Sequence, residues 1–155
     1  MGLYHFELFA DYFQFYLMDV KSNDDTSEIW SKEALENKLG ILKNTLAVGT
    51  FRNVDVNVEI ELCESEPTVN LEEWDHVAIG YFEIFSGECA VFGCTDYLPE
   101  AKTIILKLGN YSALSLAKGL NTIVTEWEAA EDLYKVILWP SNQREFKVLK
   151  NYHVT

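Results

Sequence analysis

The side chains that most often carry catalysis are sparse in this 155-residue chain. His76 follows Asp75 and could act as a base oriented by that carboxylate. Adjacent residues on a strand point to opposite faces, however, so these two side chains would not meet, and a structural or surface role for His76 is favoured. His5 and His153 lie near the ends of the chain, where the same interpretation holds. Because the sequence has no Gly-x-Ser-x-Gly, glycine-rich phosphate loop or His-Glu-x-x-His motif, it predicts no catalytic residue and a protein that is not an enzyme.

The three cysteines, Cys63, Cys89 and Cys94, are an odd number at uneven spacing. A site made of Cys89, Cys94 and His76 would match no strong zinc pattern, because the two cysteines are separated by four residues within an expected strand. Buried free thiols are the favoured interpretation. The paired acids, such as Asp24-Asp25, do not follow the order of a calcium-binding loop. We therefore expect neither a bound metal nor a cofactor.

Residues 54–62 alternate between aliphatic and polar side chains, which predicts a strand with one buried and one outward face. Carboxylates at alternate positions of a strand lie about 7 Å apart, a spacing comparable with that of successive phosphates along one DNA strand. Such a ladder could occupy a groove built for a polyanion, and the open alternative is that these acids only keep the protein soluble. The predicted buried side is Val54, Val56, Val58, Ile60 and Leu62; the predicted partner-binding acids are Asp55, Glu59 and Glu61, with Glu72, Glu73 and Asp75 as a second acidic patch.

The composition is strongly acidic, since 25 Asp and Glu against 12 Lys and Arg give a net charge of -13. This balance argues against direct binding of nucleic acid, which needs the opposite charge, and favours a basic protein as partner. No run of about 18 apolar residues predicts a membrane span. The N-terminal segment lacks the pattern of a signal peptide, so we expect a cytoplasmic protein without a membrane partner. The oligomeric state stays open.

The first two expected elements are a strand and a helix. Residues 4–19 are apolar at nearly every position and predict one strand that is covered on both faces. Asp25 and Glu28 resemble a capping box at the start of a helix near residues 28–40, which Gly40 would end.

Strands dominate the rest of the chain. Ser86-Gly87 and Gly109-Asn110 lie between apolar runs and predict two tight hairpins. Many short strands with a single helix predict a mainly β fold: one domain of residues 1–155, built as an antiparallel, jelly-roll-like β-sandwich with one short helix. The expected strands are residues 45–50, 54–63, 74–85, 88–95, 102–108, 111–118, 134–139 and 145–152.

Four short segments carry a resemblance: Tyr12-Phe13-Gln14-Phe15, Trp30-Ser31-Lys32-Glu33-Ala34-Leu35-Glu36, Arg52-Asn53 before the acidic ladder, and Leu108-Gly109-Asn110-Tyr111. In their order along the chain they resemble a bacterial family that includes the competence-operon inhibitor of the DNA-entry nuclease. The resemblance implies a small acidic cytoplasmic protein that binds a nuclease and blocks it. Residues 122–132 look like an acidic insertion between strands, which separates this chain from that pattern.

Three hypotheses follow for the function. The leading one is a non-enzymatic inhibitor or immunity-type protein whose acidic face covers the basic substrate cleft of a nuclease or toxin. The second is a sandwich that binds a small molecule or a carbohydrate, for which exposed aromatic side chains near a loop end are expected. The third, an enzyme with a dispersed site, is least favoured because no pair of nucleophile and base is visible.

Overall fold

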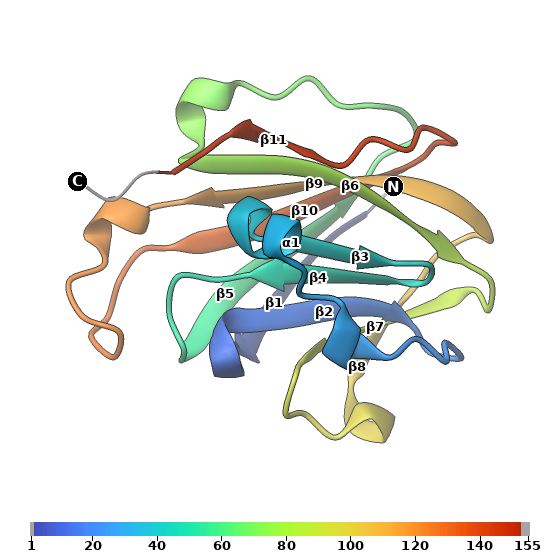
Figure 1. Cartoon of the computed structure of the whole chain (residues 1–155), viewed down its shortest axis with the longest axis horizontal. Helices are drawn as coiled ribbons and strands as arrows, with labels where there is room; N and C mark the ends of the chain where they lie inside the picture. Colours follow the sequence, from blue (N-terminus) through green and yellow to red (C-terminus); the bar gives the residue numbers. More distant parts are fainter. Residues whose placement is uncertain (1, 153–155) are drawn as a thin grey trace.

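The structure, a computed structural model, describes residues 2–152 and consists of two stacked β-sheets (Figure 1). The six-stranded sheet contains, in order across it, β1 (Gly2–Phe9), β5 (Asp55–Leu62), β10 (Leu133–Pro140), β9 (Gly109–Lys118), β6 (His76–Ile84) and β11 (Lys147–Lys150). The five-stranded sheet contains β3 (Leu39–Leu42), β4 (Thr45–Gly49), β2 (Gln14–Asp19), β7 (Glu88–Gly93) and β8 (Lys102–Ile105). The helix α1 (Lys32–Asn37) and five 3-10 turns connect them: η1 (Asp11–Phe13), η2 (Thr26–Glu28), η3 (Leu71–Glu73), η4 (Leu98–Glu100) and η5 (Leu120–Thr122).

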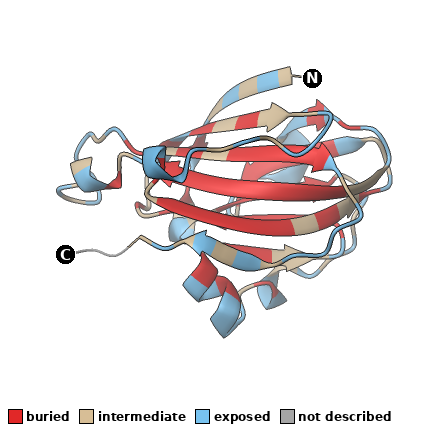
Figure 2. Cartoon of the chain, turned by 90° about the horizontal axis from the view of Figure 1, so that it is seen from above, coloured by how far each residue is buried: buried red, intermediate tan, exposed pale blue. Residues whose placement is uncertain are grey.

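The aliphatic side of the alternating segment packs between the two sheets, as predicted. Val56, Val58 and Ile60 are fully buried there, and Val54 and Leu62 are partly buried against the same core. Figure 2 shows that burial is concentrated in the central strands, whereas the connecting loops are exposed. The prediction of a mainly β fold, a β-sandwich with one short helix, is confirmed, and the pairing within the two sheets is mostly antiparallel as predicted.

One strand pair departs from the antiparallel pattern. β10 lies between β5 and β9 and pairs with β5 in parallel and with β9 antiparallel. A parallel pair needs a crossover rather than a tight turn, and here the connection from β5 to β10 contains β6 and β9 of the six-stranded sheet and β7 and β8 of the five-stranded sheet.

Both predicted hairpins are wrong. β6 and β7, joined by Ser86-Gly87, belong to different sheets, and so do β8 and β9, joined through Gly109. The glycines do adopt the positive φ that the sequence indicated, at 87° and 137°. At the first turn the buried Asp19 carboxylate accepts hydrogen bonds from the backbone N–H groups of Phe85 and Ser86, and this contact guides the chain across to the other sheet.

The opening apolar segment is two strands rather than one. β1 belongs to the six-stranded sheet and β2 to the five-stranded sheet, and η1 turns the chain between them. Tyr12 and Phe13 adopt left-handed φ values of 57° and 62° in this turn. Aromatic residues rarely adopt this conformation, so nothing in the sequence indicated the break.

The helix is shorter than predicted. Asp25 caps η2 by accepting a hydrogen bond from the Ser27 N–H, whereas Ser31 caps α1 by accepting from the Ala34 N–H. Lys38 ends α1 in a left-handed conformation, and Gly40 lies within β3. No helix among residues 2–152 is long and apolar enough to cross a membrane.

The connection from β5 to β6 covers part of the outer face of the six-stranded sheet. Cys63 and Val69 in this connection pack on a second apolar cluster that includes Trp74 and Trp139. This burial explains why β6, β9 and β10 have apolar residues on both faces.

Candidate partner-binding surface

The acidic ladder lies on the outer face of β5, as its alternation predicted, but a lysine occupies its middle. The parallel register places Lys135 of β10 opposite Glu59. The Lys135 Nζ lies 2.7 Å from Glu61 Oε1 and 3.9 Å from Glu59 Oε1. This hydrogen-bonded ammonium lowers the pKa of Glu61, and both glutamates are only partly exposed. Asp55 at the start of the strand is exposed, and it forms no ion pair with any of residues 2–152.

The second predicted patch is not one surface. Glu72 and Glu73 are exposed on η3. Asp75, in contrast, is half-buried, and its Oδ2 accepts a hydrogen bond of 3.0 Å from the Leu120 N–H, so it holds the end of β9. The Lys150 Nζ donates to the Leu71 carbonyl, which places η3 beside β11. Because β5 and β11 lie toward opposite edges of the sheet, the structure does not bring the six predicted acids together.

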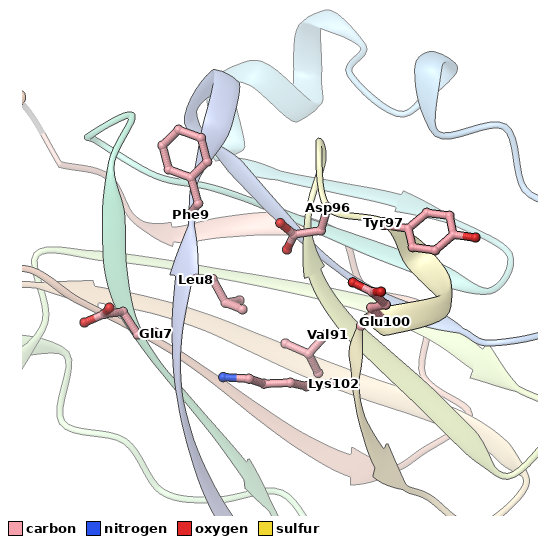
Figure 3. Close-up of a pocket in the computed structure, with 9 residues that line it drawn as sticks. Glu7, Leu8, Phe9, Val91, Asp96, Tyr97, Glu100 and Lys102 are labelled. Atoms are coloured by element: carbon pink, nitrogen blue, oxygen red, sulfur yellow. The ribbon is translucent and has the colours of Figure 1, made fainter.

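A cleft of about 270 Å³ opens between β1 of one sheet and the β7–β8 connection of the other (Figure 3). Asp96 and Glu100 face β1 across it, and Glu7 and Phe9 line the β1 side. The Lys102 ammonium extends toward β1 and lies 5.6 Å from the ring centroid of Phe6. The carboxylates of Asp96 and Glu100 against one ammonium make this rim acidic, so it can accept cationic side chains of a partner.

The cleft adjoins the acidic ladder. In the β1–β5 register, Phe9 pairs with Asp55 and Glu7 pairs with Asn57. Gly93 of β7 lies against the end of β1: a Cβ atom there would lie 2.2 Å from the Phe9 carbonyl oxygen, so only glycine fits. Asp55, Glu7, Asp96 and Glu100 thus follow one open edge of the sandwich.

A separate apolar groove of about 230 Å³ lies between η1 and α1. Tyr12, Phe13 and Leu35 line it and are 69%, 41% and 60% exposed. The Trp30 indole N–H donates to Gln14 Oε1 over 2.6 Å and fixes one wall. Exposed apolar side chains in a groove are typical of binding surfaces.

The backbone around this groove is held in an unfavourable conformation. Tyr12, Phe13 and Lys38, with φ of 57°, 62° and 58°, are the non-glycine residues with positive φ among residues 2–152, and all three line the groove. The Tyr12 N–H donates to Asn53 Oδ1, and the Phe13 carbonyl accepts from the Thr50 N–H. Strained residues that the surroundings hold in place concentrate at functional sites.

A buried ion pair ties the same end of the sandwich to the connection between β9 and β10. The Arg52 guanidinium donates to both carboxylate oxygens of Asp132, at 2.6 and 3.1 Å, and to the Glu128 carbonyl at 2.9 Å. The Tyr134 hydroxyl donates to Asp132 and accepts from the Phe51 N–H. Asp132 is 1% exposed. The acidic insertion expected from the sequence is therefore anchored at its base.

The candidates for catalysis take structural positions. His76 is buried: its Nε2–H donates to the Asn37 carbonyl and its Nδ1 accepts from the Tyr152 N–H, and burial lowers its pKa. Burial raises the pKa of all three cysteine thiols, which are free. His5 is exposed on β1, and His153 lies outside the described residues. Within residues 2–152 no three His, Cys, Asp or Glu side chains are grouped to hold a metal ion.

Sequence reasoning missed the exposed aromatic residues at this end of the fold. Tyr12 and Phe13 stand in an apolar run that indicated a strand, and only the tertiary contacts of η1 turn them outward. Trp127 lay within the acidic insertion, where an aromatic residue among acids was the one available signal. Three of the segments that carry the family resemblance, at Tyr12, Trp30 and Arg52, meet here through Gln14 and Asn53.

Comparison with known proteins supports the fold but not a sequence family. No family model matches the chain, and no curated protein matches it. Two solved structures do. ComJ from Bacillus subtilis, described as the inhibitor of the DNA-degrading activity of NucA, is 16% identical and superposes with a TM-score of 0.67 over 91% of this chain and 96% of its own. A protein described as crocagin biosynthetic gene J is 14% identical, with a TM-score of 0.59 over 91% of this chain and 98% of its own. The resemblance inferred from the sequence is thus confirmed as a shared fold: the chain has the β-sandwich architecture of the nuclease inhibitor ComJ.

Proposed function

We propose that this chain is a non-enzymatic, immunity-type inhibitor that acts in the cytoplasm by binding a basic protein, a nuclease or a toxin, and covering its substrate cleft. The observation that carries the proposal is the fold shared with ComJ over 91% of the chain. Among residues 2–152, both ring nitrogens of His76 contact backbone groups, and no group of His, Cys, Asp or Glu side chains is arranged to hold a metal ion.

The charge of the protein supports a basic partner. A net charge of -13 attracts a cationic surface over long range and speeds encounter. The unpaired acids along the open edge, Asp55, Asp96 and Glu100, are the best placed to meet such a surface. Glu59 and Glu61 contribute less than the sequence suggested, because Lys135 neutralises part of their charge.

Inhibition of DNA degradation tests the proposal. The purified chain is mixed with nucleases purified from the source cell, and the cleavage of plasmid DNA is measured at increasing ratios of chain to enzyme. We expect stoichiometric inhibition of one basic nuclease, with an association rate that falls as salt rises, because exposed charges are screened over about 8 to 10 Å at physiological ionic strength. Failure to inhibit or bind any of these enzymes would contradict the nuclease proposal.

A pair of charge variants tests the acidic edge. Asp55→Asn combined with Glu100→Gln should slow association while dissociation changes little. Glu145→Gln is the matched control, since Glu145 is exposed and lies 3.4 Å from Lys147 near the far edge of the six-stranded sheet. Equal association rates for the two variants would remove the acidic edge from the proposal.

The second candidate function, binding of a carbohydrate or small molecule, is favoured by one observation. Tyr12 and Trp127 are exposed by 69% and 76% in loops at one end, which is the feature expected for that hypothesis. Titration of the protein with a panel of oligosaccharides, followed by tryptophan fluorescence, distinguishes the two candidates.

A further inference from the structure

The loop of residues 123–131, between η5 and β10, exposes the two most accessible large apolar side chains among residues 2–152. Val124 is 79% exposed and Trp127 is 76% exposed. In Figure 1 this loop projects at the left, beyond the ends of the strands. We call it the Trp127 loop. A single exposed apolar residue is ordinary in a monomer. Whether this loop is a binding surface therefore depends on the contacts that hold its backbone and on its charge.

Hydrogen bonds fix the shape of the Trp127 loop at its neck. The Thr122 hydroxyl donates to the Gly119 carbonyl over 2.6 Å and accepts from the Glu131 N–H over 2.8 Å. Gly119 has a φ of 72°, and a Cβ atom there would lie 2.2 Å from the Glu131 carbonyl oxygen, so the neck closes only around glycine.

The tip of the loop is also held. The Arg52 Nη1 donates to the Glu128 carbonyl over 2.9 Å, and the Glu128 N–H donates to the Thr125 hydroxyl over 3.2 Å. Arg52 itself is anchored by the buried Asp132. An aromatic side chain on a backbone that is already ordered loses less conformational entropy on binding, as hot-spot residues of interfaces do.

The charge of the loop selects one kind of partner. Residues 123–131 contain Glu126, Glu128 and Glu131 and no Lys or Arg. The parallel register pairs Leu133 with Asn57, so the exposed Asp55 lies at the same end of the sheet as the base of the loop. An indole between two glutamates resembles, in chemistry, a base between two phosphates: the ring stacks on aromatic or cationic side chains, and the carboxylates pair with Lys and Arg.

We propose that the Trp127 loop enters the cationic DNA-binding cleft of the nuclease that the protein inhibits, with Trp127 in the place of a base and Glu126 and Glu128 in the place of phosphates. This inference rests on the proposed function and names the part of the chain that blocks the substrate. The loop binds in the substrate cleft of the enzyme rather than at a distant region. Inhibition is therefore competitive with DNA.

Three variants test the inference in the inhibition assay with plasmid DNA. Trp127→Ala, and separately Glu126→Gln combined with Glu128→Gln, should each raise the concentration needed for half-inhibition about tenfold or more. The matched control is Leu108→Ala: Leu108 is 67% exposed and precedes Gly109 at the start of β9, whereas the Trp127 loop follows the other end of this strand. Circular dichroism and urea unfolding should show that all variants fold as the wild type does, because the replaced side chains are exposed.

Fluorescence gives a second readout. Of the four tryptophans, Trp74 and Trp139 are buried at 8% and 3% exposure, Trp30 is partly buried, and Trp127 is 76% exposed, so the emission most accessible to acrylamide comes from Trp127. Adding the nuclease should protect this emission, and adding a DNA oligonucleotide to the complex should restore its quenching.

The outcomes separate the two proposals. Tenfold loss of inhibition in both loop variants, with the control unchanged, supports the inference. Full inhibition by Trp127→Ala, or protection that DNA does not reverse, overturns it while the proposed function stands. A wild-type chain that inhibits no nuclease overturns both, and quenching of Trp127 by an oligosaccharide in that case favours the second candidate function.

Discussion

Removing the buried cation at the base of the Trp127 loop provides the sharpest test of how this end of the fold is held. In Arg52→Met the Asp132 carboxylate, 1% exposed in the wild type, keeps only the Tyr134 hydroxyl as a partner. Breaking a buried ion pair by removing one partner costs about 3 to 5 kcal/mol, because the remaining charge is left without compensation. The Glu128 carbonyl also loses its donor, which adds about 1 kcal/mol.

Urea unfolding, followed by circular dichroism, measures this loss. We expect the free energy of unfolding to fall by about 4 kcal/mol, which moves the midpoint by about 2 M if the m-value is about 2 kcal/mol/M. The total free energy of unfolding of a domain of this size is roughly 5 to 15 kcal/mol, so the variant would be only marginally stable. Limited proteolysis should then cut residues 123–131 first, because the loop has lost its anchor.

Two companion variants separate the charge from the packing. Arg52→Lys keeps the charge but cannot donate to both Asp132 oxygens and to Glu128 together. Its free energy of unfolding should therefore lie between those of the wild type and Arg52→Met. Arg52→Met combined with Asp132→Leu removes both charges and should recover most of the loss. A cost below about 1 kcal/mol for Arg52→Met with an unchanged m-value, or a double variant less stable than Arg52→Met, would refute the view that this ion pair anchors the loop.

Three further predictions concern separate features. Tyr12→Gly should leave stability equal to the wild type or raise it by up to about 1 kcal/mol, because glycine adopts the left-handed φ freely, while partner binding weakens; urea unfolding and inhibition assays measure the two effects. Because burial lowers the pKa of His76, its contribution to stability is complete above about pH 6.5, the unfolded value, and is lost as pH falls through the lower folded value. His76→Gln should flatten this part of the pH profile of stability, and a profile identical to the wild type would contradict the assignment. The Cys89 thiol, fully buried and with its pKa raised by burial, should not react with a thiol reagent until the protein unfolds, whereas reaction in the native state would show that the core opens there.

The sequence predicted features that depend on neighbours along the chain and missed those that depend on distant ones. The alternation in β5 identified both its buried face and its acidic face, because side-chain direction on a strand follows from a period of two. Lys135 could not be placed opposite Glu59, since the β5–β10 pairing joins residues far apart in the sequence. The turn at Gly87 combines both kinds of feature. Its positive φ was predictable from the sequence, but the sheet to which the next strand belongs depends on the distant carboxylate of Asp19.

The candidate site follows this rule as well. The acids chosen from the sequence were exposed or partly exposed, yet Asp75 bonds to the backbone of Leu120 and two of the others pair with Lys135. The residues that form the apolar groove and the Trp127 loop come from segments that only the tertiary structure brings to one end. Arg52 and Asp132, which join two of these segments, are 80 positions apart.

The position of β10 between β5 and β9 also determines when the protein can fold. Before residues 133–140 leave the ribosome, β5 and β9 have no partner on their facing sides, and the six-stranded sheet is two separate pieces with open edges. Closing the gap requires a long-range parallel pairing, which is slow compared with hairpin formation. The nascent chain is therefore exposed to aggregation until its last strands are made, and its folding completes only after synthesis of the C-terminal region.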